Sequence, residues 1–123
     1  QSNLIYLNND TNTANYSDRR LIGNGSAASS NTGNNRLFIP DGSTDTASTF
    51  GNAEIYIPNY TSSTYKSFYI DGMLENNATD ARQGLTSQLW SNTAAITSIK
   101  LTPNAATNFK QYSSAYLYGV KNA

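Results

Sequence analysis

Apolar residues recur along this chain with a period near two, in short runs that polar turns separate. This alternation is typical of β-strands with one buried face, whereas an amphipathic helix repeats every 3.6 residues. Residues 82–90 fit either a strand or one short helix, since Leu85 and Leu89 lie four positions apart. The other runs predict strands at 3–8, 16–22, 36–39, 53–57, 66–71, 73–75, 96–101 and 112–120.

Turn-forming residues bound these runs. Gly23-Asn-Gly25 and Pro40-Asp-Gly42 are turn signals, and Pro58 marks a strand end or an edge strand. Residues 26–35 and 42–49 hold only small or polar side chains, which predicts two exposed loops.

The runs are short, about eight in number, and separated by turn signals at regular intervals. Gly72, between two of the runs, predicts a bulge or kink. This spacing favours an all-β fold, an antiparallel β-sandwich with a jelly-roll-like arrangement. A chain of 123 residues is enough for one core, so we expect a single β-sandwich domain over 1–123.

The composition restricts the chemistry that this surface can perform. Ser, Thr and Asn make up 46 of the 123 residues, and His and Cys are absent. Without imidazole or thiolate groups, the chain lacks most of the side chains that act as bases, nucleophiles or metal ligands. We therefore expect a protein that is not an enzyme and that holds no cofactor. Nine Tyr and a net charge of zero favour a fold over disorder.

The charges also bear on the partners. Four Lys and four Arg are spread along the chain, so no cationic cluster is available for nucleic acid or for an anionic membrane surface. The apolar runs are far shorter than the roughly 20 residues that cross a bilayer. We expect neither nucleic-acid binding nor membrane insertion. The chain shows no charged-then-apolar leader, and its start at Gln1 rather than Met indicates processing or truncation.

Two pairs of carboxylates are candidates for the two facing acids that glycoside hydrolysis needs. Asp41 and Asp45 lie in a turn, where Asp commonly caps its own backbone. Asp71 and Glu75 flank the expected kink at Gly72. No motif fixes the geometry of either pair, so ordinary turn and surface roles are favoured.

Calcium binding is a second hypothesis for the oxygen-rich turns. Asp10 has Asn8 and Asn12 beside it, and the turn at 41–45 carries three oxygen-bearing side chains at alternate positions. Neither segment has the central Gly and distal bidentate Glu of a calcium loop. We therefore expect no metal site.

The tyrosines form the candidate contact surface. Tyr56, Tyr60, Tyr65 and Tyr69 cluster around the hairpin expected between the strands at 53–57 and 66–71. Tyr provides a large, rigid contact area without charge, which suits stacking on sugar rings or on a neighbouring subunit. The strand propensity of aromatic residues also accounts for this placement without any binding role.

Several longer strings are specific enough to compare with known families: Ile-Tyr-Ile-Pro-Asn-Tyr-Thr-Ser-Ser at 55–63, Glu-Asn-Asn-Ala-Thr at 75–79, Leu-Trp-Ser-Asn-Thr-Ala-Ala-Ile-Thr-Ser-Ile at 89–99 and Tyr-Leu-Tyr-Gly-Val at 116–120. Together with Leu-Ile-Gly-Asn-Gly-Ser at 21–26, they resemble a family of virion proteins of tailed bacteriophages, common in phages of aquatic bacteria. The resemblance covers about residues 9–120.

The resemblance implies a bacteriophage virion structural protein on the particle exterior, either a capsid decoration (cement) protein or a tail-fibre component. Its partners would be other virion proteins and further copies of itself, trimers especially. The alternative is a carbohydrate-binding receptor module of a tail fibre, which would bind a host-surface glycan; a third reading is a polysaccharide-degrading tailspike fragment. Similar proteins carry additional strands ahead of the segment matched by 2–16, so we expect this chain to lack N-terminal strands.

Overall fold

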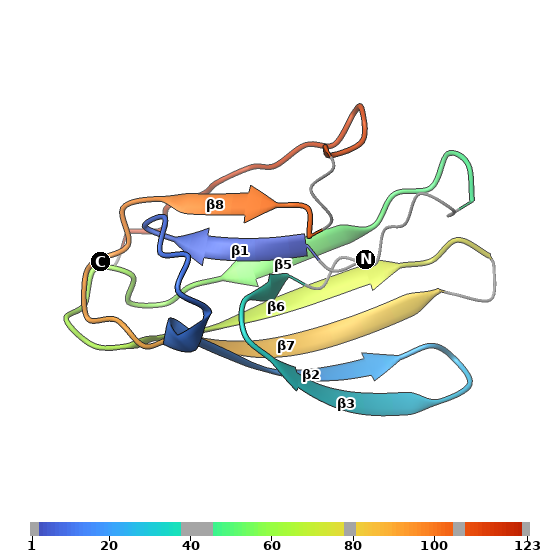
Figure 1. Ribbon diagram of the computed structural model, residues 1–123. Helices are drawn as coiled ribbons and strands as arrows, with labels where there is room; N and C mark the ends of the chain where they lie inside the picture. Colours follow the sequence, from blue (N-terminus) through green and yellow to red (C-terminus); the bar gives the residue numbers. More distant parts are fainter. Residues whose placement is uncertain (1–2, 38–45, 78–80, 105–107, 122–123) are drawn as a thin grey trace.

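The structure is a computed structural model that describes residues 3–37, 46–77, 81–104 and 108–121. Its secondary structure there consists of eight strands and one short 3-10 turn (Figure 1). The elements are β1 (Asn3–Leu7), η1 (Thr13–Asn15), β2 (Tyr16–Gly23), β3 (Ala28–Gly33), β4 (Arg36–Leu37), β5 (Asn52–Tyr56), β6 (Lys66–Leu74), β7 (Arg82–Trp90) and β8 (Ile99–Thr102).

The strands form two antiparallel sheets that face each other. The larger sheet has the order β3-β2-β7-β6-β5 and the smaller sheet the order β4-β1-β8. Figure 1 shows β5 and β8 toward one side of the sandwich and β2 and β3 toward the opposite side. The predicted all-β sandwich is therefore confirmed, with its strands divided five and three between the sheets.

The core lies between the sheets and comes from the alternation read in the sequence. Ile5 and Leu7 of β1 are fully buried against the inner face of the larger sheet, where Phe68, Ile70 and Trp90 point inward. Burying a side chain of this size contributes about 1.5–3 kcal/mol, so these few residues supply most of the drive to close the sandwich. Phe68 and Ile70 share one face of β6 and Tyr69 lies on the other, as predicted.

Loop residues close one end of the sandwich. Asn8 has a φ of 53°, and its side-chain oxygen accepts from the backbone N–H groups of Thr97 (2.7 Å) and Ser98 (3.2 Å). Its side-chain amide donates to the Ala95 carbonyl at 2.8 Å. These bonds join the end of β1 to the segment before β8, and Ile96 of that segment reaches the core. Asn tolerates the left-handed conformation that this turn requires.

The prediction of a polar loop at 26–35 was wrong, because β3 lies within it. The strand has no hydrophobic alternation: residues 28–32 are exposed, and Gly33 is half-buried. It forms because a tight turn returns the chain along β2. In that turn the Asn24 side chain accepts from the Ala27 N–H at 2.8 Å, and Gly25 adopts a φ of +85°. The backbone ladder with β2 then specifies the strand.

Other boundaries shifted for identifiable reasons. β6 runs through Gly72 without a bulge and takes in part of the run expected at 73–75, because Gly72 pairs in register with Ala53 on one side and Gly84 on the other. The ambiguous segment at 82–90 is a strand, β7. Of the strand expected at 36–39, the first two residues form β4, and the rest lie outside the described residues, as does the first half of the loop expected at 42–49.

The last predicted strand, at 112–120, was also wrong. This segment is not paired with any described strand, and its side chains are exposed. The strand before it, expected at 96–101, is present but shorter: β8 begins at Ile99.

Candidate functional site

Two central strands of the larger sheet present leucines to solvent and polar side chains to the interior. Leu21 of β2 and Leu85 of β7 are paired in register on the outside, with 57% and 51% of their surface exposed. On the inside, Asp18, Thr86 and Gln88 are buried. At these positions the usual arrangement of a sandwich, in which apolar residues face the other sheet, is reversed, whereas Tyr16 and Trp90 of the same strands point into the core.

Specific contacts hold this inverted register in place. The Arg20 Nε lies 3.0 Å from the buried Asp18 carboxylate, and the Gln88 side chain donates to the Arg36 carbonyl at 3.0 Å. A Cβ at Gly33 would lie 2.8 Å from Asp18 Oδ2, so glycine is what allows β3 to pass over the ion pair. Because shifting a strand by one residue moves every side chain to the other face, these contacts keep both leucines outside.

The outer face of the larger sheet is the candidate site, and five exposed apolar or aromatic side chains define it. They come from four adjacent strands: Leu21, Tyr56, Tyr69, Met73 and Leu85. The strand pairing places them in neighbouring rows of one rigid surface. Exposed apolar groups gathered on one face are typical of contact sites, whereas scattered single residues are not.

Tyr56 and Tyr69 form an aromatic pair on this outer face. They are cross-strand partners of β5 and β6, with ring centroids 5.5 Å apart and ring planes at 35°. The Tyr69 hydroxyl donates to Glu54 Oε1 at 3.3 Å. Desolvation, and then the negative charge of Glu54, raises the pKa of the Tyr69 phenol above its usual value. Tyr69 therefore stays protonated near neutral pH and remains a hydrogen-bond donor.

The other two predicted tyrosines lie elsewhere. Tyr60 and Tyr65 are exposed and belong to the loop between β5 and β6, outside the strands. The Tyr60 backbone carbonyl accepts from the Ile96 N–H at 2.8 Å, which ties this loop to the segment before β8. The structure thus confirms a hairpin under the tyrosine cluster but brings only two of the four rings together.

The candidate carboxylates have different neighbours from those considered in the sequence. Asp71 lies on the outer face opposite Glu54 in the β5–β6 register, and Glu75 accepts from the Asn77 N–H at 2.7 Å. Asp41 and Asp45 lie outside the described residues. Two adjacent exposed carboxylates attract a cation weakly and are not a cage of the six or more oxygens that Ca²⁺ requires.

The structure gives the Asp10 carboxylate a role other than calcium binding. Its carboxylate accepts from Trp90 Nε1 (2.8 Å), Asn15 Nδ2 (2.8 Å) and the Asn12 N–H (3.0 Å). The Asn8 side chain points instead to the segment before β8. Asp10 therefore fastens a turn to the tryptophan. In the described ranges, no three Asp, Glu, His or Cys residues are grouped to hold a metal ion.

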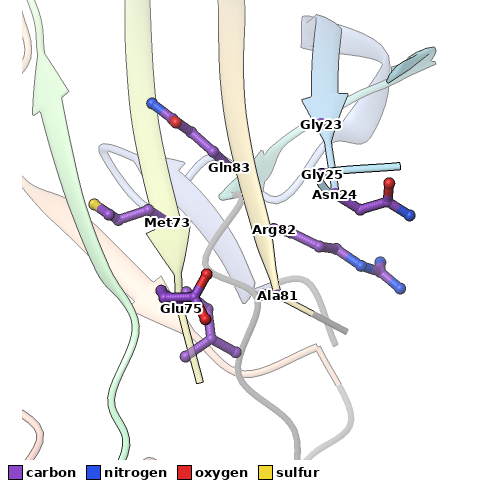
Figure 2. Close-up of a pocket in the computed structure, with 9 residues that line it drawn as sticks. Gly23, Asn24, Gly25, Met73, Glu75, Ala81, Arg82 and Gln83 are labelled. Carbon is purple, nitrogen blue, oxygen red and sulfur yellow. The ribbon is translucent and has the colours of Figure 1, made fainter. Parts of the chain in front are cut away.

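A shallow pocket of about 340 Å³ opens where the β2–β3 turn meets the last residues of β6 and the first residues of β7. In Figure 2 the Arg82 side chain extends from β7 toward Asn24, whereas Met73 and Gln83 extend to the other side. Its polar groups do not converge on one point, which a ligand site requires. The pocket is therefore a depression beside the outer face. No helix in the described chain is long and apolar enough to cross a membrane.

Leu21, Leu85, Met73 and Glu54 were missed as members of the site. The alternation in the sequence was not enough to place the leucines outside: once 82–90 is read as a strand, Leu85 alternates with Thr86 and Gln88, so one face carries both polar residues. The hydrophobic pattern assigns that face to solvent, and only the contacts of Asp18 and Gln88 reveal that it is buried.

Comparisons with protein-family models, with curated proteins and with solved structures gave no match for this chain.

Proposed function

We propose that this chain is a structural component of a tailed bacteriophage virion, placed on the outside of the particle, and that it acts by protein–protein contact without catalysis. The observation that carries the proposal is the outward placement of Leu21 and Leu85 on two central strands. Exposed apolar side chains gathered on one face of a sheet are typical of surfaces that a partner covers. The resemblance of the strings at 55–63 and 89–99 to phage virion proteins supports the particle role.

The proposed contact is one of shape and apolar burial. The outer face is a rigid sheet, so it loses little conformational entropy when it docks. Leu21, Leu85 and Met73 would supply apolar area, and Tyr56 and Tyr69 would add aromatic area with a hydroxyl that can donate. If the partner is the assembled shell, a decoration protein that binds only this state stabilises it by mass action.

The test is to introduce Leu85→Asp into the gene of a phage that carries it and to label purified particles with an antibody against the chain. Burying a leucine contributes about 1.5–3 kcal/mol, and each 1.4 kcal/mol is tenfold in affinity, so we expect incorporation to fall about tenfold or more. Thr93→Asp adds the same charge in an exposed loop and should leave incorporation unchanged.

Electron microscopy of the labelled wild-type particles also gives the location. Label over the head indicates decoration, and label on the tail indicates a fibre component. Purified particles without label, or equal labelling of the Leu85→Asp and wild-type particles, would contradict the proposal.

The second candidate function is glycan recognition at a fibre tip, and the Tyr56–Tyr69 pair beside Glu54 favours it. Aromatic rings provide stacking surfaces for sugars, and a nearby carboxylate can accept from sugar hydroxyls. The test is binding of the chain to a glycan array. If Tyr69→Ala abolishes this binding and Leu85→Asp preserves it, the result supports glycan recognition in place of the virion contact.

A further inference from the structure

The C-terminal segment is an extended apolar arm that nothing in the described chain covers. We define the arm as residues 113–121. Its large side chains are among the most exposed in the protein: Tyr116 79%, Leu117 83%, Tyr118 83% and Val120 83%. No hydrogen bond joins residues 114–121 to the rest of the described chain. The arm begins after a turn in which the Ser113 N–H donates to the Lys110 carbonyl at 3.1 Å.

The arm has the composition of a strand. Tyr116, Tyr118 and Val120 alternate with Ala115, Leu117 and Gly119, and no proline interrupts the segment. In an extended chain these two sets point to opposite faces. Aromatic and β-branched residues favour strands, and the unpaired backbone of such a segment is ready to add to a sheet edge.

A sheet edge of matching character is present on the same chain. Within the described residues, β5 ends the larger sheet and β8 ends the smaller one, and both lie toward the same side of the sandwich (Figure 1). Along this side the apolar residues that contact the core are only partly buried: Ala53, Ile55, Ile57 and Leu101. We call this the open side. An added strand beside β8 would cover it.

We propose that the arm of one copy adds as a strand to the β8 edge of a second copy, and that copies of this chain join into a homo-oligomer by exchanging arms. The inference goes beyond the proposed virion role, because it depends on the arm and the open side and not on the outer face. Leu117, between Ala115 and Gly119, would face the apolar residues of the open side.

Strand addition draws its affinity mainly from main-chain hydrogen bonds, to which alternate side chains add specificity. In the proposed contact Leu117 covers the open side, and Tyr116, Tyr118 and Val120 lie on the opposite face of the added strand. Seven arm residues span roughly 23 Å at about 3.3 Å each, longer than the four residues of β8 require. The net charge of zero adds no repulsion between copies.

The test combines mass measurement with cross-linking. Light scattering after size exclusion should show a defined oligomer for the whole chain, and monomers for Leu117→Asp and for a chain that ends at Tyr112. Because the chain has no cysteine, introduced thiols report unambiguously. Tyr118→Cys in one chain and Lys100→Cys in a tagged second chain should form a mixed disulfide on oxidation. Ser30→Cys, on the distant edge strand β3, should not.

Three results would overturn the inference: a whole chain that stays monomeric up to the solubility of the protein; an oligomer that survives loss of the arm; or a disulfide that stays within one chain. To detect such an intrachain disulfide, a chain that carries both Tyr118→Cys and Lys100→Cys is mixed with an excess of unmodified protein and then oxidised. Equal incorporation of the Leu85→Asp variant and the wild type would contradict the proposed virion role and leave the arm-exchanged oligomer intact, so the two proposals fail separately.

Discussion

Lys66 shows how single polar residues hold this fold together. Its side chain is buried, and Nζ donates to the carbonyls of Thr64 (2.6 Å), Ser62 (2.8 Å) and Ala94 (2.9 Å). The ammonium also lies 5.9 Å from the centre of the Trp90 ring. A buried cation is costly unless polar groups surround it, and here carbonyl oxygens from two separate loops do so. The residue therefore fixes the β5–β6 loop to the segment after β7.

We predict that Lys66→Met destabilises the protein by about 3 kcal/mol, because hydrogen bonds to charged groups contribute about 1.5–3 kcal/mol each and water replaces part of the loss. Lys100→Met, at an exposed position of β8, should change the free energy of unfolding by less than about 0.5 kcal/mol. Urea unfolding followed by tryptophan fluorescence measures both. Equal stability of the two variants would refute the role of Lys66.

Asp10 gives the fold a dependence on acid pH. The hydrogen bond from Trp90, followed by that from Asn15, lowers the pKa of the Asp10 carboxyl below its usual range. A carboxyl whose pKa is lower in the folded state stabilises the fold above its unfolded pKa of about 3.9, and this contribution disappears as the pH falls through the folded value.

We therefore predict that the stability of the wild type decreases on acidification from about pH 5 to pH 2 more steeply than that of Asp10→Asn, which has no charge to lose at this position. Thermal unfolding at intervals across this range is the measurement. Parallel curves for the two proteins would show that Asp10 does not contribute.

At the scale of elements, the sequence was informative for most strands that bury an alternating face. β1, β2 and β5 were predicted to within one residue of their observed bounds, β6 begins at the expected residue and runs three residues further, and the tyrosine hairpin was predicted correctly. β7 also buries an alternating face, but the spacing of its leucines left a helix open. The sequence was misleading where a strand is specified by its turn and its neighbouring strand and not by the pattern of its own side chains. β3 is specified by a turn and a backbone ladder, and its polar side chains carry no period.

Part of the candidate site was predictable, because its aromatic residues follow the alternation of two strands. The aromatic alternation on β5 and β6 identified Tyr56 and Tyr69. The leucines of the outer face could not be assigned from the sequence, because the inward side of β2 and β7 depends on an ion pair and an amide bond that form only across strands. The arm was read as a strand from its composition, and within one chain it has no partner.

At the scale of the whole molecule, exposed apolar side chains of the described residues gather on the outer face and on the arm. The outer face belongs to a paired sheet, and the backbone of the arm is unpaired within the described chain. The central claim of this account is that such surfaces are covered in the assembled state, with the arm as a strand of a second copy.

Hydrogen–deuterium exchange of the arm at a series of protein concentrations tests this claim most directly. We predict that the amides of residues 114–120 exchange slowly at high concentration, as slowly as those of β1, and that dilution removes this protection because the copies separate. Exchange of these amides as fast as in an unstructured peptide, at every concentration up to the solubility of the protein, would contradict the account.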